Sequence, residues 1–269
     1  MFNKGYKIAA FTLAEVLITL GIIAILAAVT IPSLMKNVNA SKYSSQFQQA
    51  LSSLNQAIRM AQSNFDVDYA STNEKCNIES ARSESATQVF TFCSIYNSTL
   101  SGASYVGQLS AVPGYSIRVR SDLNSYFIFD NPVYAEGNSR VIMSTTPSDY
   151  LGYALASGVM VGFNKDAVGC AVDTGKLPDD NWISNNTHCI GFIDINGVAG
   201  PNTVVNCDDV NALEINPNST CAVTVDANHI TDIYPVIFYN GSVIPATPAA
   251  RSIASKWKQS TLTDNLGGN

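Results

Sequence analysis

The sequence has few charged residues and few side chains suited to catalysis. Charged residues make up 13% of the 269 residues, and only two residues are histidines, His188 and His229. Neither histidine belongs to a Cys-x-x-Cys or His-x-x-x-His spacing of the kind that zinc sites use. The sequence also has no glycine-rich phosphate loop and no dinucleotide-binding fingerprint. These absences argue against an enzyme, so we expect none.

Basic residues are scarce as well. The chain has 15 Lys and Arg against 21 Asp and Glu, and nucleic-acid affinity depends on many basic contacts to phosphates. One small basic cluster with an aromatic residue stands out in the acid-free stretch Ile233–Thr263: Arg251, Lys256, Trp257 and Lys258. Three cations are too few for strong phosphate binding, so we favour an ordinary solvated surface over contact with DNA.

The longest apolar run extends from Phe11 to Leu34, 24 residues in which Glu15 is the only charge. As a helix this run would be ~36 Å long, enough to cross a hydrocarbon core of ~30 Å. The run therefore predicts a transmembrane helix over 11–34, because a secretory signal core is usually only ~7 to 15 residues long. A charge inside a bilayer costs at least ~2.5 to 3.5 kcal/mol, so Glu15 predicts a partner from elsewhere.

The N-terminal pattern resembles the class III signal of type IV pilins and type II secretion pseudopilins. The resemblance rests on a short basic leader (MFNKGYKIAA), then Phe11, then Thr-Leu-Ala-Glu-Val-Leu-Ile, and a long apolar run with Pro32 near its end. It implies that a membrane peptidase removes residues 1–10 by cutting between Ala10 and Phe11, and that Phe11 is then N-methylated. The family usually has Gly where this chain has Ala10. The resemblance covers roughly residues 1–60.

The resemblance gives Glu15 a role in assembly, because it matches the family's glutamate at the fifth mature position. We expect its carboxylate to pair with the α-ammonium group of Phe11 of a neighbouring subunit, since two charges that are costly in lipid partly cancel. The implied partners are copies of the chain or other pilins, the prepilin peptidase and the bacterial inner membrane. The implied location is the inner membrane with a periplasmic head, and then a periplasmic or surface filament.

An amphipathic helix is predicted over residues 35–65, continuing the transmembrane segment into the head. Its apolar residues fall on one stripe at helical spacing: Tyr43, Phe47, Ala50, Leu51, Leu54, Ala57, Ile58, Ala61 and Phe65, with Ser45, Gln49, Ser52, Asn55, Gln56 and Arg59 opposite. Pro32 predicts a kink where the helix leaves the bilayer. The alternative is two separate helices broken at Pro32.

The rest of the chain, residues 66–269, predicts a globular head rich in antiparallel strands. Short apolar runs alternate with Gly, Pro, Asn and Ser clusters, at 115–120, 126–129, 140–143, 159–163, 190–195 and 234–239. The segment Asn73–Ala103 fits either a loop or a short helix. The expected fold class is α+β and pilin-like, with the long N-terminal helix packed on this sheet.

Six cysteines in an exported head indicate an oxidising compartment. Six cysteines allow 15 pairings, and the sequence alone selects none. Closure between nearest neighbours favours Cys76 with Cys93, Cys170 with Cys189 and Cys207 with Cys221.

A calcium site is conceivable in the segment Asp194–Asp209, DINGVAGPNTVVNCDD. Asn196-Gly197 favours a tight turn, and Asp194, Asp208 and Asp209 place acidic oxygens around it. The related major pseudopilins hold calcium in a loop of the head. The spacing is not an EF-hand, however, and an aspartate before Asn-Gly is commonly just the cap of a turn, which is the reading we favour.

The expected function is that of a structural subunit of a type IV pilus or a type II secretion pseudopilus. One alternative is a minor or DNA-uptake pilin whose head binds a ligand. Another is an exported, anchored protein unrelated to filaments. Neighbouring genes separate these: secretion ATPase and secretin genes favour the first, and competence genes favour the second.

Overall fold

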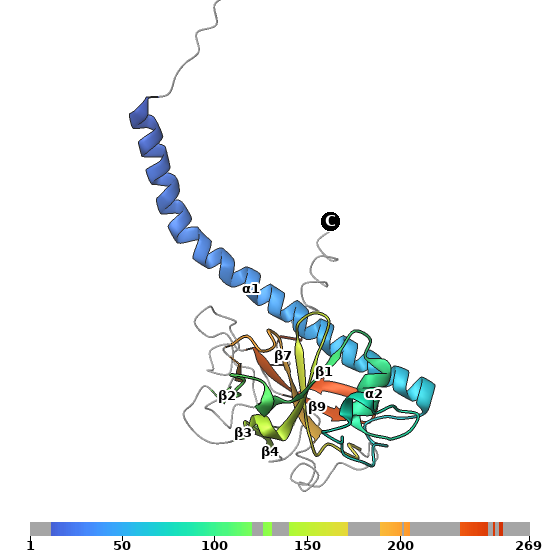
Figure 1. The fold of residues 1–269 in the computed structure, drawn as a ribbon. Coiled ribbons are helices and arrows are strands. Elements are labelled where there is room, and N and C mark those ends of the chain that lie inside the picture. The colour runs from blue at the N-terminus through green and yellow to red at the C-terminus, as the bar shows by residue number, and fades with distance from the viewer. Residues whose placement is uncertain are drawn as a thin grey trace, which may run out of the picture. The chain divides into compact units, whose positions relative to one another are not determined.

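A computed structural model describes residues 12–119, 126–130, 140–171, 189–200, 202–204, 232–246, 250 and 253–254 (Figure 1). The chain forms two compact units, residues 1–41 and 42–269. Within helix α1 the side chains of residues 29 and 31–41 also lie outside the described part. The predicted leader and the cleavage site at Ala10 and Phe11 lie outside the described residues too.

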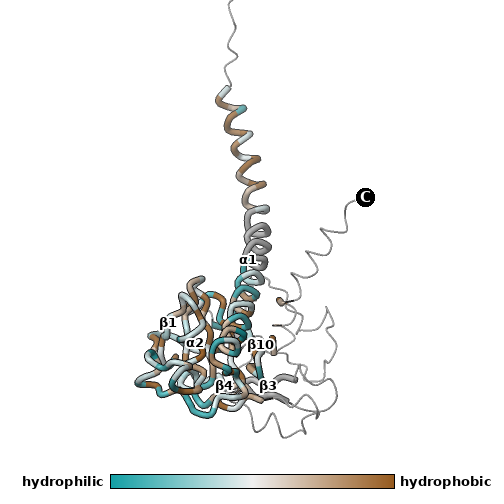
Figure 2. Tube along the Cα trace, turned by 90° about the vertical axis from the view of Figure 1, so that its right-hand side faces the viewer, coloured by the Kyte–Doolittle hydropathy of each residue, from teal (hydrophilic) through white to brown (hydrophobic). Residues whose placement is uncertain are grey.

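Helix α1 runs without a break from Leu13 to Phe65, over 53 residues. The prediction that the helix continues beyond Leu34 is confirmed, and the alternative of two helices separated at Pro32 is wrong. No helix in the described part of the chain combines the length and the apolar character needed to cross a membrane. Figure 2 colours the first turns of α1 mostly brown, whereas teal residues recur beyond residue 42.

The second half of α1 packs on the head through the predicted apolar stripe. Six residues of the stripe are at most 1% exposed, namely Phe47, Ala50, Leu54, Ala57, Ile58 and Ala61. The other three, Tyr43, Leu51 and Phe65, are partly buried against the same core. The amphipathic helix is therefore confirmed residue by residue for 43–65, because the 3.6-residue period places all nine side chains on one face.

The head is built on one eight-stranded sheet and a separate hairpin. The order in the sheet is β1-β5-β6-β7-β9-β8-β2, with β10 paired to β9. The bounds are β1 Ser104–Gln108, β2 Arg118–Val119, β5 Tyr150–Ala154, β6 Met160–Asn164, β7 Ile190–Asp194, β8 Thr203–Val204, β9 Ile233–Tyr239 and β10 Ser242–Pro245. The hairpin pairs β3, Tyr126–Asp130, with β4, Arg140–Ser144. All pairings are antiparallel except those of β8 with β2 and with β9, so the predicted α+β class with an antiparallel sheet is confirmed.

The segment Asn73–Ala103, for which the sequence fits either a loop or a short helix, contains both. Helix α2 spans Phe92–Thr99 and begins with a capping box, in which the Thr91 side chain accepts from the Ser94 amide and the Ser94 side chain accepts from the Thr91 amide. Three short 3₁₀ helices are η1 Ala81–Ser83, η2 Leu109–Ala111 and η3 Pro147–Asp149. The sequence did not predict α2, because Thr91 is followed three residues later by Ser94 and not by the Glu or Gln that marks a typical capping box.

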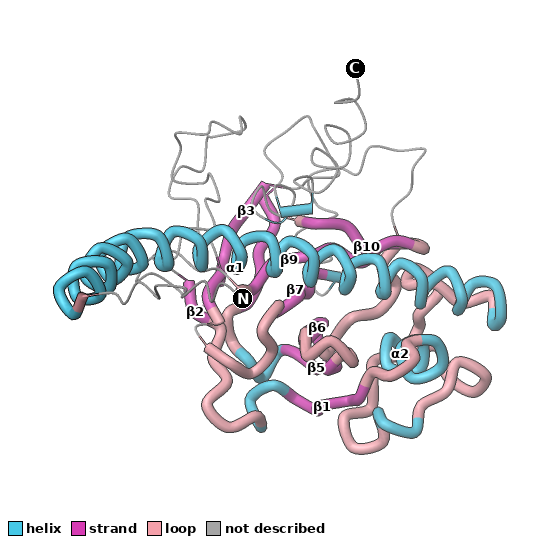
Figure 3. The backbone as a smooth tube through the Cα atoms, turned by 90° about the horizontal axis from the view of Figure 1, so that it is seen from above, coloured by secondary structure: helices cyan, strands magenta, loops and turns pink. Residues whose placement is uncertain are grey.

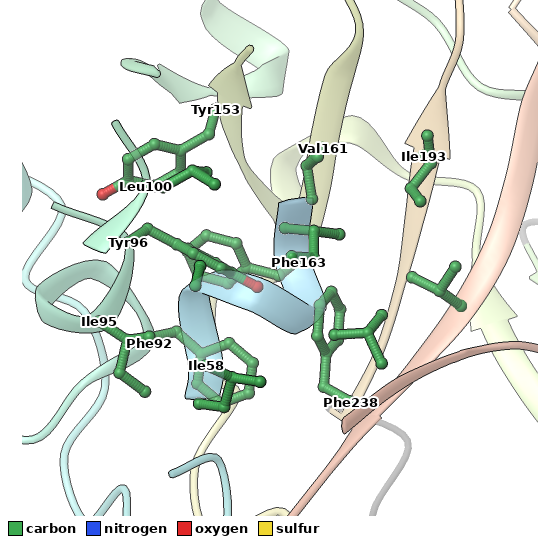
Figure 4. Packing of buried hydrophobic residues seen from close by; sticks show 14 of the residues in the cluster. Ile58, Phe92, Ile95, Tyr96, Leu100, Tyr153, Val161, Phe163, Ile193 and Phe238 are labelled. Carbon is green, nitrogen blue, oxygen red and sulfur yellow. The ribbon is translucent and has the colours of Figure 1, made fainter. Parts of the chain in front are cut away.

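Both faces of the central strands are buried. Figure 3 shows the part of α1 from residue 42 to residue 65 lying across the sheet, with α2 beside its C-terminal end. Side chains facing these helices include Tyr153, Val161, Phe163, Ile193 and Phe238, which surround Ile58 of α1 and Phe92 of α2 (Figure 4). The alternate residues of the same strands face a second apolar cluster with Leu109, Tyr115 and Met143: Tyr150, Met160, Ile190, Phe192, Ile233 and Ile237. Burial on both faces explains why these strands read as continuous apolar runs.

Polar side chains of α1 fasten the C-terminal part of the chain to this helix. Asn55 accepts from the Val243 amide and donates to the Val243 carbonyl, both at 2.9 Å. Ser44 donates to the carbonyl of Ile253 at 2.9 Å, and Gln48 donates to that of Ala254 at 2.9 Å. Asn55 was expected on the solvent face, but it is half-buried because β10 covers that flank of the helix.

Replacing Gly191 with alanine is expected to destabilise the head. A Cβ at Gly191 would lie 2.2 Å from the Gly162 carbonyl oxygen and 2.6 Å from the Phe238 ring, so backbone would have to move. Overpacking of this kind typically costs ~1 to 3 kcal/mol. We expect Gly191→Ala to lower the denaturant midpoint of the full chain, whereas Gly200→Ala, which meets nothing within 4 Å, leaves it nearly unchanged. Equal midpoints in the two variants would contradict the close packing of β6 and β7.

Candidate functional site

A capping box at the start of α1 engages the carboxylate of Glu15. The Thr12 amide and the Thr12 hydroxyl both donate to Glu15 Oε2 at 2.9 Å, and the Glu15 amide donates back to the Thr12 hydroxyl at 3.3 Å. Oε1 accepts no hydrogen bond from any described residue. Thr12 was missed by the sequence analysis, although Thr-x-x-Glu before an apolar run is a known signature of a helix start.

The first four turns of α1 are apolar on every side and exposed. Nine large apolar side chains are between 45% and 81% exposed: Leu13, Val16, Leu17, Ile18, Leu20, Ile22, Ile23, Ile25 and Leu26. At 100° per residue they cover the whole circumference of the helix rather than one stripe.

A second polar site is buried in the head, where strands β7 and β9 lie side by side. Asp194 is the last residue of β7 and pairs with Ile233, so Asp232 lies next to it at the same end of the sheet. Both aspartates are fully buried. The Tyr115 hydroxyl donates to Asp194 Oδ2 at 2.9 Å, and the Asn202 amide donates to Asp232 Oδ2 at 2.7 Å.

The predicted turn after Asp194 forms. Gly197 has φ +66°, and a Cβ there would lie 2.6 Å from the Gly158 carbonyl oxygen, so the position requires glycine. The Asn196 side-chain amide donates to the Gly200 carbonyl at 3.1 Å and closes the turn. Asn202, with φ +51°, brings the chain back beside Asp232.

Three buried side-chain oxygens around this turn have no hydrogen bond of good geometry from any described residue: Asp194 Oδ1, Asn196 Oδ1 and Asn202 Oδ1. The backbone amides of Asn196 and Gly197 nevertheless lie close enough to the Asp194 carboxylate to favour its charged form. Buried polar atoms without partners are rare in folded proteins. All three are acceptors; one belongs to the carboxylate of Asp194, and the carboxylate of Asp232 lies beside it. The residues present therefore fit a hard cation such as calcium, which takes carboxylate and amide oxygens as ligands.

Burial raises the pKa of Asp194 to about 8, with the neighbouring carboxylate of Asp232 adding to the effect. The hydrogen bond from Tyr115 and the backbone amides of Asn196 and Gly197 partly oppose this rise. Burial together with the Asp194 carboxylate also raises the pKa of Tyr115, so its hydroxyl stays a donor. Without a cation, burial therefore favours the protonated form of Asp194 over the charged form.

Of the three predicted calcium ligands, the structure describes Asp194, which lies in this cluster. Asp208 and Asp209 lie outside the described residues. Tyr115, Asn202 and Asp232 were missed, because nothing local in the sequence marks them. Their proximity to Asp194 depends on strand pairing between segments up to 79 residues apart.

Two of the three predicted disulfides are confirmed, Cys76–Cys93 and Cys170–Cys189. Cys207 and Cys221 lie outside the described residues, as do His188 and His229. The carboxylate of Glu84 lies within 4.8 Å of the sulfur atoms of Cys76 and Cys93. These sulfurs are bonded to each other, so they are not thiolate ligands for a metal.

Comparison with known proteins gives no relative: no family model, no curated protein and no solved structure matches this chain. The function therefore has to be argued from the residues themselves.

The stability of the head is expected to depend on pH through Asp194. The folded carboxyl keeps its proton up to about pH 8, against an ordinary pKa of 3.8. Between these values the unfolded chain binds fewer protons than the folded chain, so the free energy of unfolding falls as pH rises, by up to ~1.4 kcal/mol per pH unit. Denaturant unfolding with a metal chelator present, from pH 5 to pH 9, should show a smaller pH dependence for Asp194→Asn than for the wild type. Equal pH dependence would mean that Asp194 is ionised in the fold.

Proposed function

We propose that this chain is a pilin-like subunit of a type IV pilus or a type II secretion pseudopilus. The observation that carries the proposal is the start of α1, where nine large apolar side chains are exposed around the whole helix. A helix that is apolar on all sides is stable only when it is surrounded by lipid or by other apolar helices. A filament subunit needs both surroundings in turn, the membrane before assembly and the filament core afterwards.

Membrane insertion is supported by the sequence run Phe11–Leu34, 24 residues with one charge. This run extends beyond the residues whose side chains the structure describes. In the proposal, residues 1–10 are removed by a prepilin peptidase, and Phe11 becomes the methylated N-terminus. Lys4 and Lys7 leave with the leader, so the mature chain carries a net charge of −8.

The geometry at Glu15 supports a role in assembly. Thr12 donates only to Oε2, which leaves Oε1 available to a donor from outside the chain. A carboxylate with one open oxygen in an apolar surrounding gains most from a cation, because each charge otherwise bears its full desolvation cost. The α-ammonium group of Phe11 of a neighbouring subunit is the cation that the mature chain itself supplies.

The head is consistent with export. Two disulfides brace it, and disulfides persist in oxidising compartments such as the bacterial periplasm. The alternative of a minor or DNA-uptake pilin shares the same N-terminal helix and differs only in what the head binds. The two are separated by asking whether the chain makes up the bulk of sheared filaments or only a trace of them.

Substitutions at Glu15 test the assembly role. Glu15→Ala and Glu15→Gln should both insert into the membrane, but both should lower the yield of sheared filaments. Glu15→Gln keeps an oxygen that can accept from Thr12 and lacks only the charge, so a role in helix capping alone predicts near-normal filaments from that variant. The measurement is mass spectrometry of the filament fraction, with wild-type subunits expected to begin at Phe11. Normal yield from Glu15→Ala would contradict the proposal.

A second candidate function of the head is binding of calcium. It is favoured by the three buried oxygens without donors beside Asp194 and Asp232. Asp194, Asn202 and Asp232 are the residues that would hold the ion, and a bound ion would tie the ends of β7 and β9 together by charge. The alternative is that a proton, and not a cation, neutralises Asp194 in this site.

Calcium should raise the melting temperature of the full chain if it binds here, because an ion that binds only the folded state stabilises that state in proportion to its concentration above the dissociation constant. Melting is measured with excess calcium and with excess chelator. Asp194→Ala should abolish the difference, whereas Asp166→Ala, which removes a half-exposed carboxylate paired with Lys75, should preserve it. Identical melting temperatures of the wild type in both conditions would favour the other explanation, a protonated Asp194 without a bound ion.

A further inference from the structure

The second half of α1 presents a solvent-facing surface without acidic residues, which we call the outer stripe. It lies opposite the buried apolar stripe, spans ~100° of the helix circumference, and consists of Lys42, Ser45, Gln49, Ser52, Gln56, Arg59, Met60 and Ser63, all exposed. Five of the eight are Ser or Gln, two are cations, and Met60 is 46% exposed. Neither Lys42 nor Arg59 makes an ion pair with any described residue.

The charge of α1 differs from that of the remaining chain. From Val16 to Phe65 the sequence has three basic residues and no acidic residue, whereas residues 66–269 carry 20 acidic against 10 basic residues. A surface helix of a soluble domain normally mixes both signs. In the half of the helix that packs on the head, residues 42–65, the charged residues are Lys42 and Arg59, both cations in a chain that is otherwise acidic, and this bias favours an acidic partner surface.

A complementary surface lies on the disulfide-braced loop of the same unit, and we call it the acidic loop. It presents the exposed carboxylates of Glu74 and Glu79 beside Ile78 and Phe90, which are 44% and 41% exposed. In the described part of residues 42–269, four large apolar side chains are exposed. They are Met60, Ile78, Phe90 and Val198. Three of the four exposed apolar side chains therefore lie on the outer stripe or the acidic loop.

The acidic loop is held in one shape before any partner arrives. The Cys76–Cys93 disulfide closes it. The Glu84 carboxylate turns back into the loop, where it accepts from the Asn77 amide at 2.7 Å and from the Thr91 hydroxyl. The loop has two cations, Lys75 and Arg82. The charge of Lys75 is offset by Asp166, because its Nζ atom lies 2.8 Å from Asp166 Oδ1. A preformed surface loses less conformational entropy on binding than a mobile one.

We propose that the outer stripe of one copy docks on the acidic loop of a second copy of this chain. In this contact the cations of the stripe, Lys42 and Arg59, face the carboxylates of the acidic loop, and Met60, next to Arg59, covers exposed apolar side chains of the loop. The Ser and Gln residues of the stripe supply hydrogen bonds without adding charge.

This contact joins two different surfaces, so it is heterologous, and heterologous contacts that do not close into a ring build open chains of copies. The inference deepens the proposed function and rests on it, because it names a contact between heads in addition to the contact between N-terminal helices. It places the specificity for the next subunit in charge pairing outside the membrane.

Charge reversal on each surface tests the contact in full-length chains assembled in cells. The stripe variant is Lys42→Glu with Arg59→Glu, and the loop variant is Glu74→Lys with Glu79→Lys. Each alone should lower the filament yield about tenfold through like-charge repulsion, and a chain carrying all four substitutions should regain most of the yield. The control Arg118→Glu reverses an exposed charge on β2, outside both surfaces, and should leave the yield unchanged.

Melting temperatures of the purified variants establish that each head is folded. Reduced yield from both double variants with no recovery in the combined chain overturns the pairing, and so does normal yield from either double variant. Wild-type chains that form no filaments overturn the proposed function itself, which distinguishes that failure from a failure of this contact alone.

Discussion

The constraint on which the structure depends is that one helix must satisfy two different surroundings. From residue 43 to residue 65, α1 buries a single stripe against the sheet, where Phe47, Leu54 and Ile58 are fully shielded from solvent. Near its start the same helix carries nine large apolar side chains that are at least 45% exposed. Burial of apolar area contributes ~25 cal/mol per Å², so an exposed apolar helix of this length represents a large unrealised gain in free energy. In the proposed function this gain is realised in lipid and then among the helices of other subunits.

The central strands of the sheet are also constrained by apolar burial, because they are covered on both faces. Because α1 and α2 cover one face and η2 with the following loop covers the other, every central strand contributes to two apolar clusters. A polar side chain in such a strand is costly unless it is paired. Asp194 is the last residue of β7. Its burial costs less free energy because the Tyr115 hydroxyl donates to it and because a proton or a cation can neutralise its charge.

Periodic patterns in the sequence predicted helix and strand identity well and long-range proximity poorly. All nine residues of the α1 stripe were predicted, since a helical period is a local property that tertiary contacts rarely overrule. Strands β1 and β5 were missed, because Gly107 and Gly152 interrupt their short apolar runs, and the short strands β8 and β10 were missed as well. Two disulfides followed from closure between neighbours in sequence. The buried partnership of Asp194 with Tyr115 and Asp232 could not be predicted, because it arises from the strand order β7-β9-β8-β2, which no local spacing encodes.

The distribution of acidic residues links the two ends of α1 in the proposed filament. Stacked subunits bring heads that are each rich in carboxylates close to neighbouring helices, and a carboxylate on the helix surface would add repulsion at every repeat. The helix has one acidic residue, Glu15, and it stands in the first turn, where the N-terminal amide dipoles favour a negative charge. Beyond it, Val16–Phe65 carries only Lys36, Lys42 and Arg59. In the proposed filament, a helix with a single carboxylate at one end favours the register that brings Glu15 close to the α-ammonium group of a neighbouring Phe11, because an unpaired charge in an apolar surrounding bears its full desolvation cost.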